Sequence, residues 1–265
     1  MTIIGQDKLL QYINSHTLST FPRTIMLEGD IGSGRHLIAS YISEKFQIPQ
    51  EDISECLSYE KIEEITLRVT PYLYIIDSDK LTVKNENVIL KFLEEPLKNA
   101  YIILLCRNKY DVIETIRNRC QILSLNKYSN SCLKSFIDNT EDEGIILTIC
   151  KTPGQIYKLQ SHPIKDMLDL CIKIFDKIGA ASFSNTLTLS NNIAFKSEKD
   201  KYDFDLFFKA LLYIANIRVR NNENKSIQEY LLTSDYYNRT FIRNIDKKML
   251  FENYLLALKN LRSSQ

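Results

Sequence analysis

Three of the chain's seven glycines, Gly29, Gly32 and Gly34, lie within six residues of one another. The segment that holds them runs to His36, follows an apolar run that ends at Leu27, and opens a helical pattern. Glycine adopts a left-handed backbone at little steric cost, so it is the usual residue where a chain turns sharply. A strand, a glycine-rich turn and a helix in this order predict a loop whose backbone amides can bind phosphate.

The spacing of this segment is that of a P-loop, in which Gly-x-x-x-x-Gly is followed by Lys and then by Ser or Thr. Here Arg35 occupies the lysine position and His36 occupies the hydroxyl position. A guanidinium is a wide planar fork rather than a compact ammonium, and an imidazole is a poor ligand for Mg²⁺. Two interpretations stay open: a strand-to-helix turn with no ligand, and weak or vestigial nucleotide binding.

A P-loop ATPase also needs a carboxylate for Mg²⁺ at the end of the next core strand. The apolar run 73–76 leads into Asp77, Ser78 and Asp79, and either aspartate could hold the metal. No Asp-Glu pair follows the run, so the residue that usually orients the attacking water is missing.

Short apolar runs alternate with helical patterns over the first 125 residues. Because these runs are not alternately apolar and polar, they predict a parallel sheet that is covered on both faces. The expected strands are 23–27, 73–76, 101–105 and 121–125, and the expected helices are 6–18, 37–42, 58–69, 85–93 and 112–117.

The rest of the chain has helical patterns only. Residues 129–160 predict three short helices, with breaks at 140–144 and at Pro153-Gly154. Residues 180–202 favour an irregular connection, although a broken helix fits them as well. In the last third, apolar side chains recur at helical spacing and predict the core of a helix bundle. They are Phe204, Phe208, Leu211 and Ala215, then Leu250, Tyr254, Leu258 and Leu261.

Composition and charge exclude several classes of protein. The net charge of +1 is lower than a general polyanion-binding protein would carry. No run of eighteen apolar residues is present and the first residues do not resemble a signal peptide, so we expect no membrane partner and a cytoplasmic protein. The six cysteines and three histidines lack the spacing of a zinc site, and we expect neither zinc nor a disulfide framework.

Three stretches of the chain resemble the AAA+ clamp-loader subunits. Residues 4–6, Ile-Gly-Gln, resemble that family's Val-Gly-Gln box. Residues 79–82 and 87–96 resemble the stretch "DKMT…NALLKTLEEP", which is the most specific match. Residues 115–121 resemble "TIRSRCQ", with Asn118 in place of the serine. The motifs are most similar to those of the delta prime subunits of the bacterial DNA polymerase III clamp loader.

The resemblance implies an AAA+ fold with three domains. Residues 1–125 would be the α/β domain with a degenerate P-loop, residues 126–175 a helical lid, and residues 176–265 a helical collar for oligomerisation. The partners that it implies are other clamp-loader AAA+ subunits, the sliding clamp, and primer-template DNA bound through the assembly during DNA replication.

The departures from the family follow one pattern. Groups that bind and hydrolyse ATP in cis are altered at Arg35, His36 and Ser78, and at Gln155, where a sensor-2 arginine is expected. Arg119 is kept at the position of the arginine finger, which acts on ATP bound by a neighbouring subunit and is worth about 10³–10⁵ in rate. Without the resemblance, Arg119 would be a surface arginine at a helix end.

We therefore expect a non-hydrolysing clamp-loader subunit in which Arg119 is catalytic in trans. Neither ATP nor Mg²⁺ is expected to bind firmly in cis. The degenerate nucleotide site would comprise Gly29, Gly32, Gly34, Arg35, His36 and Asp77. The alternatives are an atypical active ATPase, in which Arg35 replaces the usual lysine, and an AAA+-like adaptor outside replication.

Overall fold

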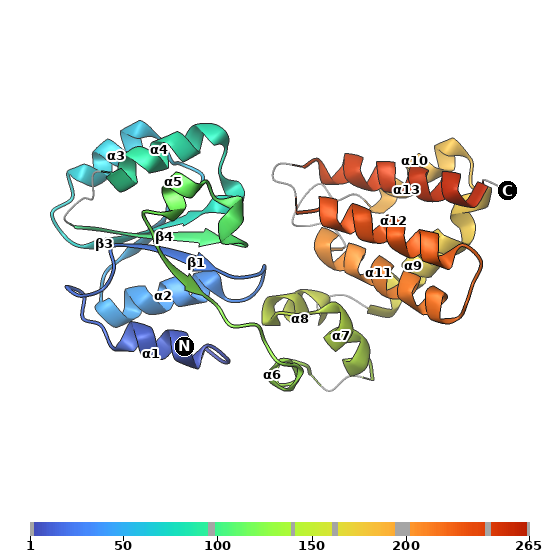
Figure 1. Cartoon of the computed structure of the whole chain (residues 1–265), viewed down its shortest axis with the longest axis horizontal. Helices are drawn as coiled ribbons and strands as arrows, with labels where there is room; N and C mark the ends of the chain where they lie inside the picture. Colours follow the sequence, from blue (N-terminus) through green and yellow to red (C-terminus); the bar gives the residue numbers. More distant parts are fainter. Residues whose placement is uncertain are drawn as a thin grey trace. The chain divides into compact units, whose positions relative to one another are not determined.

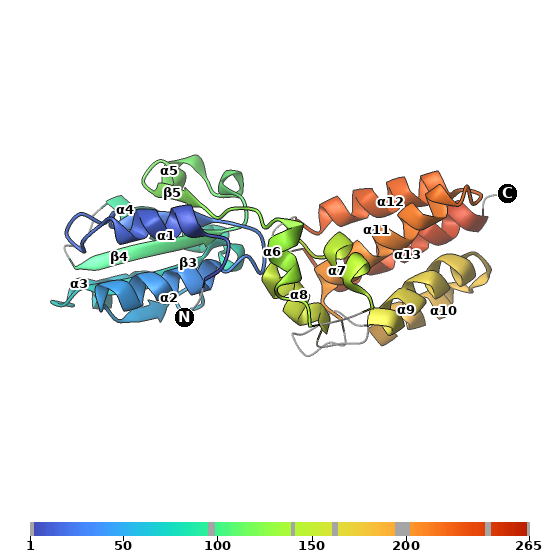
Figure 2. The same cartoon turned by 90° about the horizontal axis from the view of Figure 1, so that it is seen from below.

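The computed structural model describes residues 3–94, 99–138, 141–160, 164–193, 202–241 and 245–263. They belong to two compact units (Figures 1 and 2). The first unit comprises Met1–Ser135 and Thr152–Gly154, and the second comprises Phe136–Lys151 and Gln155–Gln265. None of the helices in the described part of the chain is long and apolar enough to cross a membrane.

A five-stranded parallel sheet with the order β2-β3-β4-β1-β5 forms the centre of the first unit. Its strands are β1 (Thr24–Glu28), β2 (Gln50–Asp52), β3 (Tyr72–Asp77), β4 (Ala100–Cys106) and β5 (Gln121–Ser124). The four strands predicted from the sequence are confirmed. Strand β2 was not predicted, because it is a polar edge strand of three residues that pairs only with β3.

Helices cover both faces of this sheet. Apolar residues of α1 (Asp7–Asn14) and α2 (Arg35–Phe46) pack with one set of strand side chains, such as Leu73 and Ile75. The other set of strand side chains, such as Tyr74 and Ile76, packs with three further helices of the first unit. These are α3 (Tyr59–Thr66), α4 (Val83–Glu94) and α5 (Glu114–Arg117). The side chains of successive strand residues therefore face opposite helix layers. The short apolar runs predicted such a sheet, covered on both faces.

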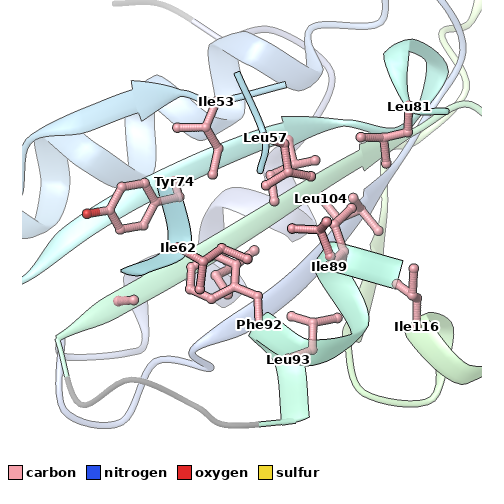
Figure 3. Close-up of a cluster of buried hydrophobic side chains, with 14 of the residues drawn as sticks. Ile53, Leu57, Ile62, Tyr74, Leu81, Ile89, Phe92, Leu93, Leu104 and Ile116 are labelled. Atoms are coloured by element: carbon pink, nitrogen blue, oxygen red, sulfur yellow. The ribbon is translucent and has the colours of Figure 1, made fainter. Parts of the chain in front are cut away.

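Figure 3 shows the second of these layers. Phe92 and Ile89 of α4 belong to the same buried cluster as Leu104 of β4 and Ile116 of α5. Phe92 is 2% exposed, and its ring lies 6.2 Å from that of Tyr74. Each such aromatic or aliphatic side chain contributes about 1.5–3 kcal/mol by leaving water. This packing fixes the end of α4, where Glu94 lies, and the end of α5, which Arg119 follows by two residues.

Short helices follow the sheet. Helix α6 (Asn130–Lys134) belongs to the first unit, α7 (Glu143–Ile149) to the second, and α8 spans Pro153–Gln160. The three helices predicted in 129–160 are confirmed. The break expected at Pro153-Gly154 is the start of α8, because proline is tolerated in the first turn of a helix.

The remaining helices pack around aromatic side chains in the second unit. They are α9 (Ile164–Lys177), α10 (Phe183–Ile193), α11 (Phe204–Arg220), α12 (Ser226–Arg239) and α13 (Lys247–Ser263). Phe208 of α11 and Tyr254 of α13 are fully buried, with ring centroids 5.4 Å apart. Helix α10 occupies part of 180–202, so the interpretation of that segment as an irregular connection is wrong over Phe183–Ile193. The division into a lid (126–175) and a collar (176–265) stays a prediction.

Candidate functional site

The glycine-rich loop between β1 and α2 has the backbone that its sequence predicts. Gly32 and Gly34 lie in the left-handed region, with φ angles of +78° and +97°. Gly34 directly precedes the first residue of α2. The amide of Gly29 extends the sheet by donating to the carbonyl of Cys106 at 3.0 Å. Two of the three glycines thus stand where a side chain would be strained.

The two residues that replace the usual lysine and hydroxyl each lie near one carboxylate. Nη2 of Arg35 lies 3.4 Å from Oδ2 of Asp79, and Nε2 of His36 lies 3.9 Å from Oδ2 of Asp77. Arg35 is 8% exposed, whereas the side chain of His36 is 56% exposed. Both carboxylates that could serve a metal therefore have a neighbour within the chain.

Environment shifts the pKa values of these two carboxyls in opposite directions. Burial raises the pKa of Asp77, but the nearby His36 ring, the Asp79 amide and the charge of Arg35 together lower that pKa below its ordinary value. Burial also raises the pKa of Asp79, and there the charge of Arg35 offsets it only in part. Asp77 is the last residue of β3 and the stronger acid, so it fits the strand-end carboxylate better than Asp79. Its role as a metal ligand stays a prediction.

The side chains around the loop do not fit a magnesium–nucleotide site. Mg²⁺ prefers oxygen ligands, but His36 offers an imidazole and Asp77 lies against it. Within the described ranges, no three His, Cys, Asp or Glu side chains gather as they would around a metal ion. Nη1 of Arg35 is buried without a hydrogen-bond partner in the described part.

Three successive carbonyls of the loop accept hydrogen bonds from later parts of the first unit. A Cβ on Gly154 would lie 2.6 Å from Cα of Gly32, so only glycine fits there. The bonds run from Thr152 Oγ1 to the Ile31 carbonyl (2.8 Å), from the Gly154 amide to the Gly32 carbonyl (2.9 Å), and from the Tyr128 hydroxyl to the Ser33 carbonyl (2.8 Å). Thr152 and the start of α8 therefore lie directly on the loop.

Three other residues from the family motifs have structural partners. Gln6 is fully buried and bonds the backbone of Asn126 twice, donating at 3.1 Å and accepting at 2.7 Å. Asn108, which follows β4, accepts from the amide of Tyr110 and caps a short 3₁₀ turn. Gln155, at the sensor-2 position, accepts from the amide of Lys151 at 2.8 Å.

Arg119 lies outside the group formed by Arg35, His36, Asp77 and Asp79. Its side chain is 37% exposed. Nη1 donates to the carbonyl of Thr115 at 2.7 Å, and Nη2 donates to Oε1 of Glu94 at 2.8 Å. These bonds hold the guanidinium at the end of α5, where part of it stays open to solvent.

Glu94 is the acidic partner of Arg119. It is the last residue of α4, in the motif Leu93-Glu94-Glu95-Pro96, of which Glu95 and Pro96 lie outside the described residues. An acid at a helix C-terminus is unfavourable with the helix dipole, and that was the one signal for a partner. The sequence could not show that the partner was Arg119.

Residues 70–129 match the model of the family described as DNA polymerase III, delta subunit. The matched segment includes β3, α4, β4 and α5, and therefore both Asp77 and Arg119. No curated protein matches the chain in sequence.

Two solved structures from Thermotoga maritima are similar to the chain. One, a DNA polymerase III gamma subunit-related protein, is 16% identical, covers 97% of this chain and 99% of its own, and has a TM-score of 0.50. The other, the RuvB Holliday junction branch migration motor, is 17% identical, covers 88% and 89%, and has a TM-score of 0.47. The first likeness supports the AAA+ fold predicted from the sequence. The family match spans residues 70–129, which is less than half of the chain, and the likeness to the gamma subunit-related protein concerns the fold.

Proposed function

We propose that this chain is a sliding-clamp loader subunit of the delta prime type, which does not hydrolyse ATP itself. It would assemble with other AAA+ subunits and offer Arg119 to ATP bound by the adjacent one. The assembly would act on the sliding clamp and on primer-template DNA. The family match and the fold support the clamp-loader setting, and the arrangement of charged side chains supports the division of roles.

The first part of the proposal is that this chain does not hydrolyse ATP. It is supported by the pairing of Arg35 with Asp79 and of His36 with Asp77. Hydrolysis requires a metal held by oxygen ligands and a residue that orients water. Ser78 follows Asp77 where a glutamate would orient the water, and its hydroxyl is buried. A nucleotide with Mg²⁺ would have to displace the histidine from Asp77.

The second part of the proposal is that Arg119 acts on ATP bound by the adjacent subunit. The exposure and charge of Arg119 support it. An arginine stays protonated at all physiological pH values and presents five N–H donors. The bonds to Thr115 and Glu94 use two of these donors. The other donors can reach the phosphate oxygens of a nucleotide on a neighbouring subunit.

Reconstitution of the full assembly tests this proposal. The Arg119→Ala chain is combined with its partner subunits, the clamp and primed DNA, and the steady-state ATPase is measured. We expect the ATPase to fall by one or more orders of magnitude, while size-exclusion chromatography shows an intact assembly.

Arg117→Ala is the matched control. Arg117 is the last residue of α5, two positions before Arg119, and pairs with Glu114 at 3.9 Å, so its loss removes a nearby cation but no bond to Arg119. The control should keep the ATPase within about twofold, as is usual for a surface substitution. An unchanged ATPase in an intact Arg119→Ala assembly would contradict the proposal.

A second function, an atypical ATPase, is favoured by one observation. The loop keeps its left-handed glycines, and Nη1 of the buried Arg35 has no partner in the described part of the chain. Calorimetric titration of Mg-ATP into the isolated chain separates the two functions. Saturable binding followed by turnover that is lost in Arg35→Ala would favour the ATPase. An adaptor outside replication would instead fail to co-purify with clamp-loader subunits.

A further inference from the structure

The ion pair between Arg119 and Glu94 connects two segments that are 25 residues apart. Both side chains are partly exposed, at 37% and 52%. An exposed ion pair adds little to folding stability, because water already solvates both charges well. A contribution to stability therefore does not account for an acid at the end of α4, where the helix dipole disfavours it.

Two contacts fix the plane of the Arg119 guanidinium. Nη1 is held by the Thr115 carbonyl, and Nη2 is held by the Glu94 carboxylate. A planar fork that is bound at both terminal nitrogens cannot rotate about its last bonds without breaking one contact. The Thr115 contact is a local one, since it belongs to the same turn of the chain. Glu94 is the contact that comes from a different element.

The backbone that carries Glu94 is rigidly placed. The two residues before it, Phe92 and Leu93, are 2% and 9% exposed and pack in the same cluster as Ile116 of α5. Figure 3 shows Leu93 and Ile116 in this cluster. The ends of α4 and α5 are thus joined by a packed core beneath the ion pair. Glu94 can therefore transmit this fixed geometry to the guanidinium.

We propose that Glu94 is a positioning residue, which orients Arg119 for the nucleotide of the neighbouring subunit. This inference rests on the proposed role of Arg119 in trans. A free arginine side chain loses rotational freedom when it is immobilised in a complex. Glu94 removes part of that freedom beforehand. Its loss should therefore lower the turnover number of the neighbouring ATPase about two- to tenfold and leave the KM for ATP unchanged.

The test compares variants of both residues in the same reconstituted assembly. The chains carry Glu94→Ala, Glu94→Gln, Arg119→Ala or the combination of Glu94→Ala with Arg119→Ala. Glu94→Gln keeps an acceptor oxygen and loses the charge, so its turnover number should lie between those of wild type and Glu94→Ala. In the combination, Glu94→Ala should have no further effect, because there is no guanidinium left to position.

Glu114→Gln is the matched control, since it breaks the neighbouring pair with Arg117 and leaves Arg119 untouched. It should behave as wild type, and all single variants should share its unfolding midpoint. A Glu94→Ala turnover number equal to or above that of wild type would overturn the positioning role while Arg119→Ala stays inactive. The same holds if Glu94→Ala lowers turnover equally with and without Arg119. If Arg119→Ala is itself fully active, the proposed function fails, and the positioning role fails with it.

Discussion

The backbone amide of Gly154 donates a hydrogen bond to the carbonyl of Gly32 at 2.9 Å. Two glycines 122 positions apart in the numbering meet through their backbones in the first unit. A Cβ on Gly154 would lie 2.6 Å from Cα of Gly32 and 2.9 Å from its carbonyl oxygen. The start of α8 can lie on the glycine-rich loop only because residue 154 has no side chain.

Substitution of Gly154 by alanine should separate the start of α8 from the glycine-rich loop between β1 and α2. Backbone atoms at 2.6 Å must move apart, and overpacking of this kind costs about 1–3 kcal/mol. We expect a lower unfolding midpoint and faster hydrogen exchange at the amide of residue 154, which loses its bond to Gly32.

Gly144→Ala is the matched control for this substitution. Gly144 lies in α7, and no atom is within 4 Å of the Cβ that alanine would add. Alanine is about 1 kcal/mol better than glycine inside a helix, so this variant should be neutral or more stable. Equal midpoints for the two variants would contradict the contact between Gly154 and Gly32.

Asp203 should stabilise the second unit through its charge. It caps α11 by accepting from the amides of Asp205 and Leu206, and it pairs with Lys158 at 2.9 Å. Burial raises the pKa of Asp203, but Lys158 and the Leu206 amide lower that pKa below its ordinary value. A lowered pKa in the folded state means that ionised Asp203 adds stability above the unfolded pKa, and that this stability is lost as the pH falls through the folded pKa.

Two variants separate the cap of α11 from the charge of Asp203. Asp203→Ala removes both and should cost about 1–2 kcal/mol at neutral pH. Asp203→Asn keeps a capping oxygen, so its loss should be smaller and confined to the charge. Urea unfolding at a series of pH values should show the wild-type advantage over Asp203→Asn shrinking below the usual aspartate range. An advantage that does not change with pH would contradict the lowered pKa.

Glu229 of α12 should contribute more to stability than any exposed carboxylate near it. It is fully buried, and its two oxygens lie against Arg218, at 3.3 Å, and Arg262. Removal of one member of a buried ion pair costs about 3–5 kcal/mol. Arg218 keeps Asp176 and Glu223 as partners, so the loss should lie at the lower end of this range. Glu229→Ala should therefore lower the free energy of unfolding by that amount in urea.

The control is Glu223→Ala, which removes another acidic partner of Arg218. Glu223 pairs with Arg218 at 2.7 Å, but its side chain is 35% exposed. Its substitution by alanine should cost at most about 1 kcal/mol, because water replaces the lost partner. If both variants lose the same free energy of unfolding, the buried Glu229 does not contribute more to stability than the partly exposed Glu223.

Prediction from sequence succeeded where the signal was local. The apolar runs around Ile25, Ile75 and Ile103 gave the central strands, and the glycine spacing gave the loop with Gly32 and Gly34 in left-handed conformation. Strand β2 was missed, because edge pairing with β3 needs no apolar run.

The contacts of the candidate site lay beyond local patterns. Arg35 and Asp79 are 44 residues apart, and only the fold brings them together. The sequence showed that Arg35 and His36 were unusual, but it did not show that each lies near a carboxylate. In the same way, only the packing of α4 and α5 in the fold brings Glu94 beside Arg119.

The last prediction restores the usual groups of the loop. Arg35→Lys combined with His36→Thr supplies a compact ammonium and a hydroxyl that can bind Mg²⁺. It also removes the imidazole that lies 3.9 Å from Oδ2 of Asp77. If the altered side chains are what weakens the site, the double variant should bind Mg-ATP at least about tenfold more tightly than wild type, a gain of about 1.4 kcal/mol.

Turnover should not follow from this gain in binding. Ser78 still stands where a glutamate would orient the water, so the isolated double variant should bind ATP without hydrolysing it. Calorimetry measures the affinity, and a phosphate-release assay measures turnover. The double variant carrying Asp77→Ala is the control, and it should lose the magnesium dependence of binding. A wild-type chain that binds Mg-ATP as tightly as the double variant would show that Arg35 and His36 do not impair the loop.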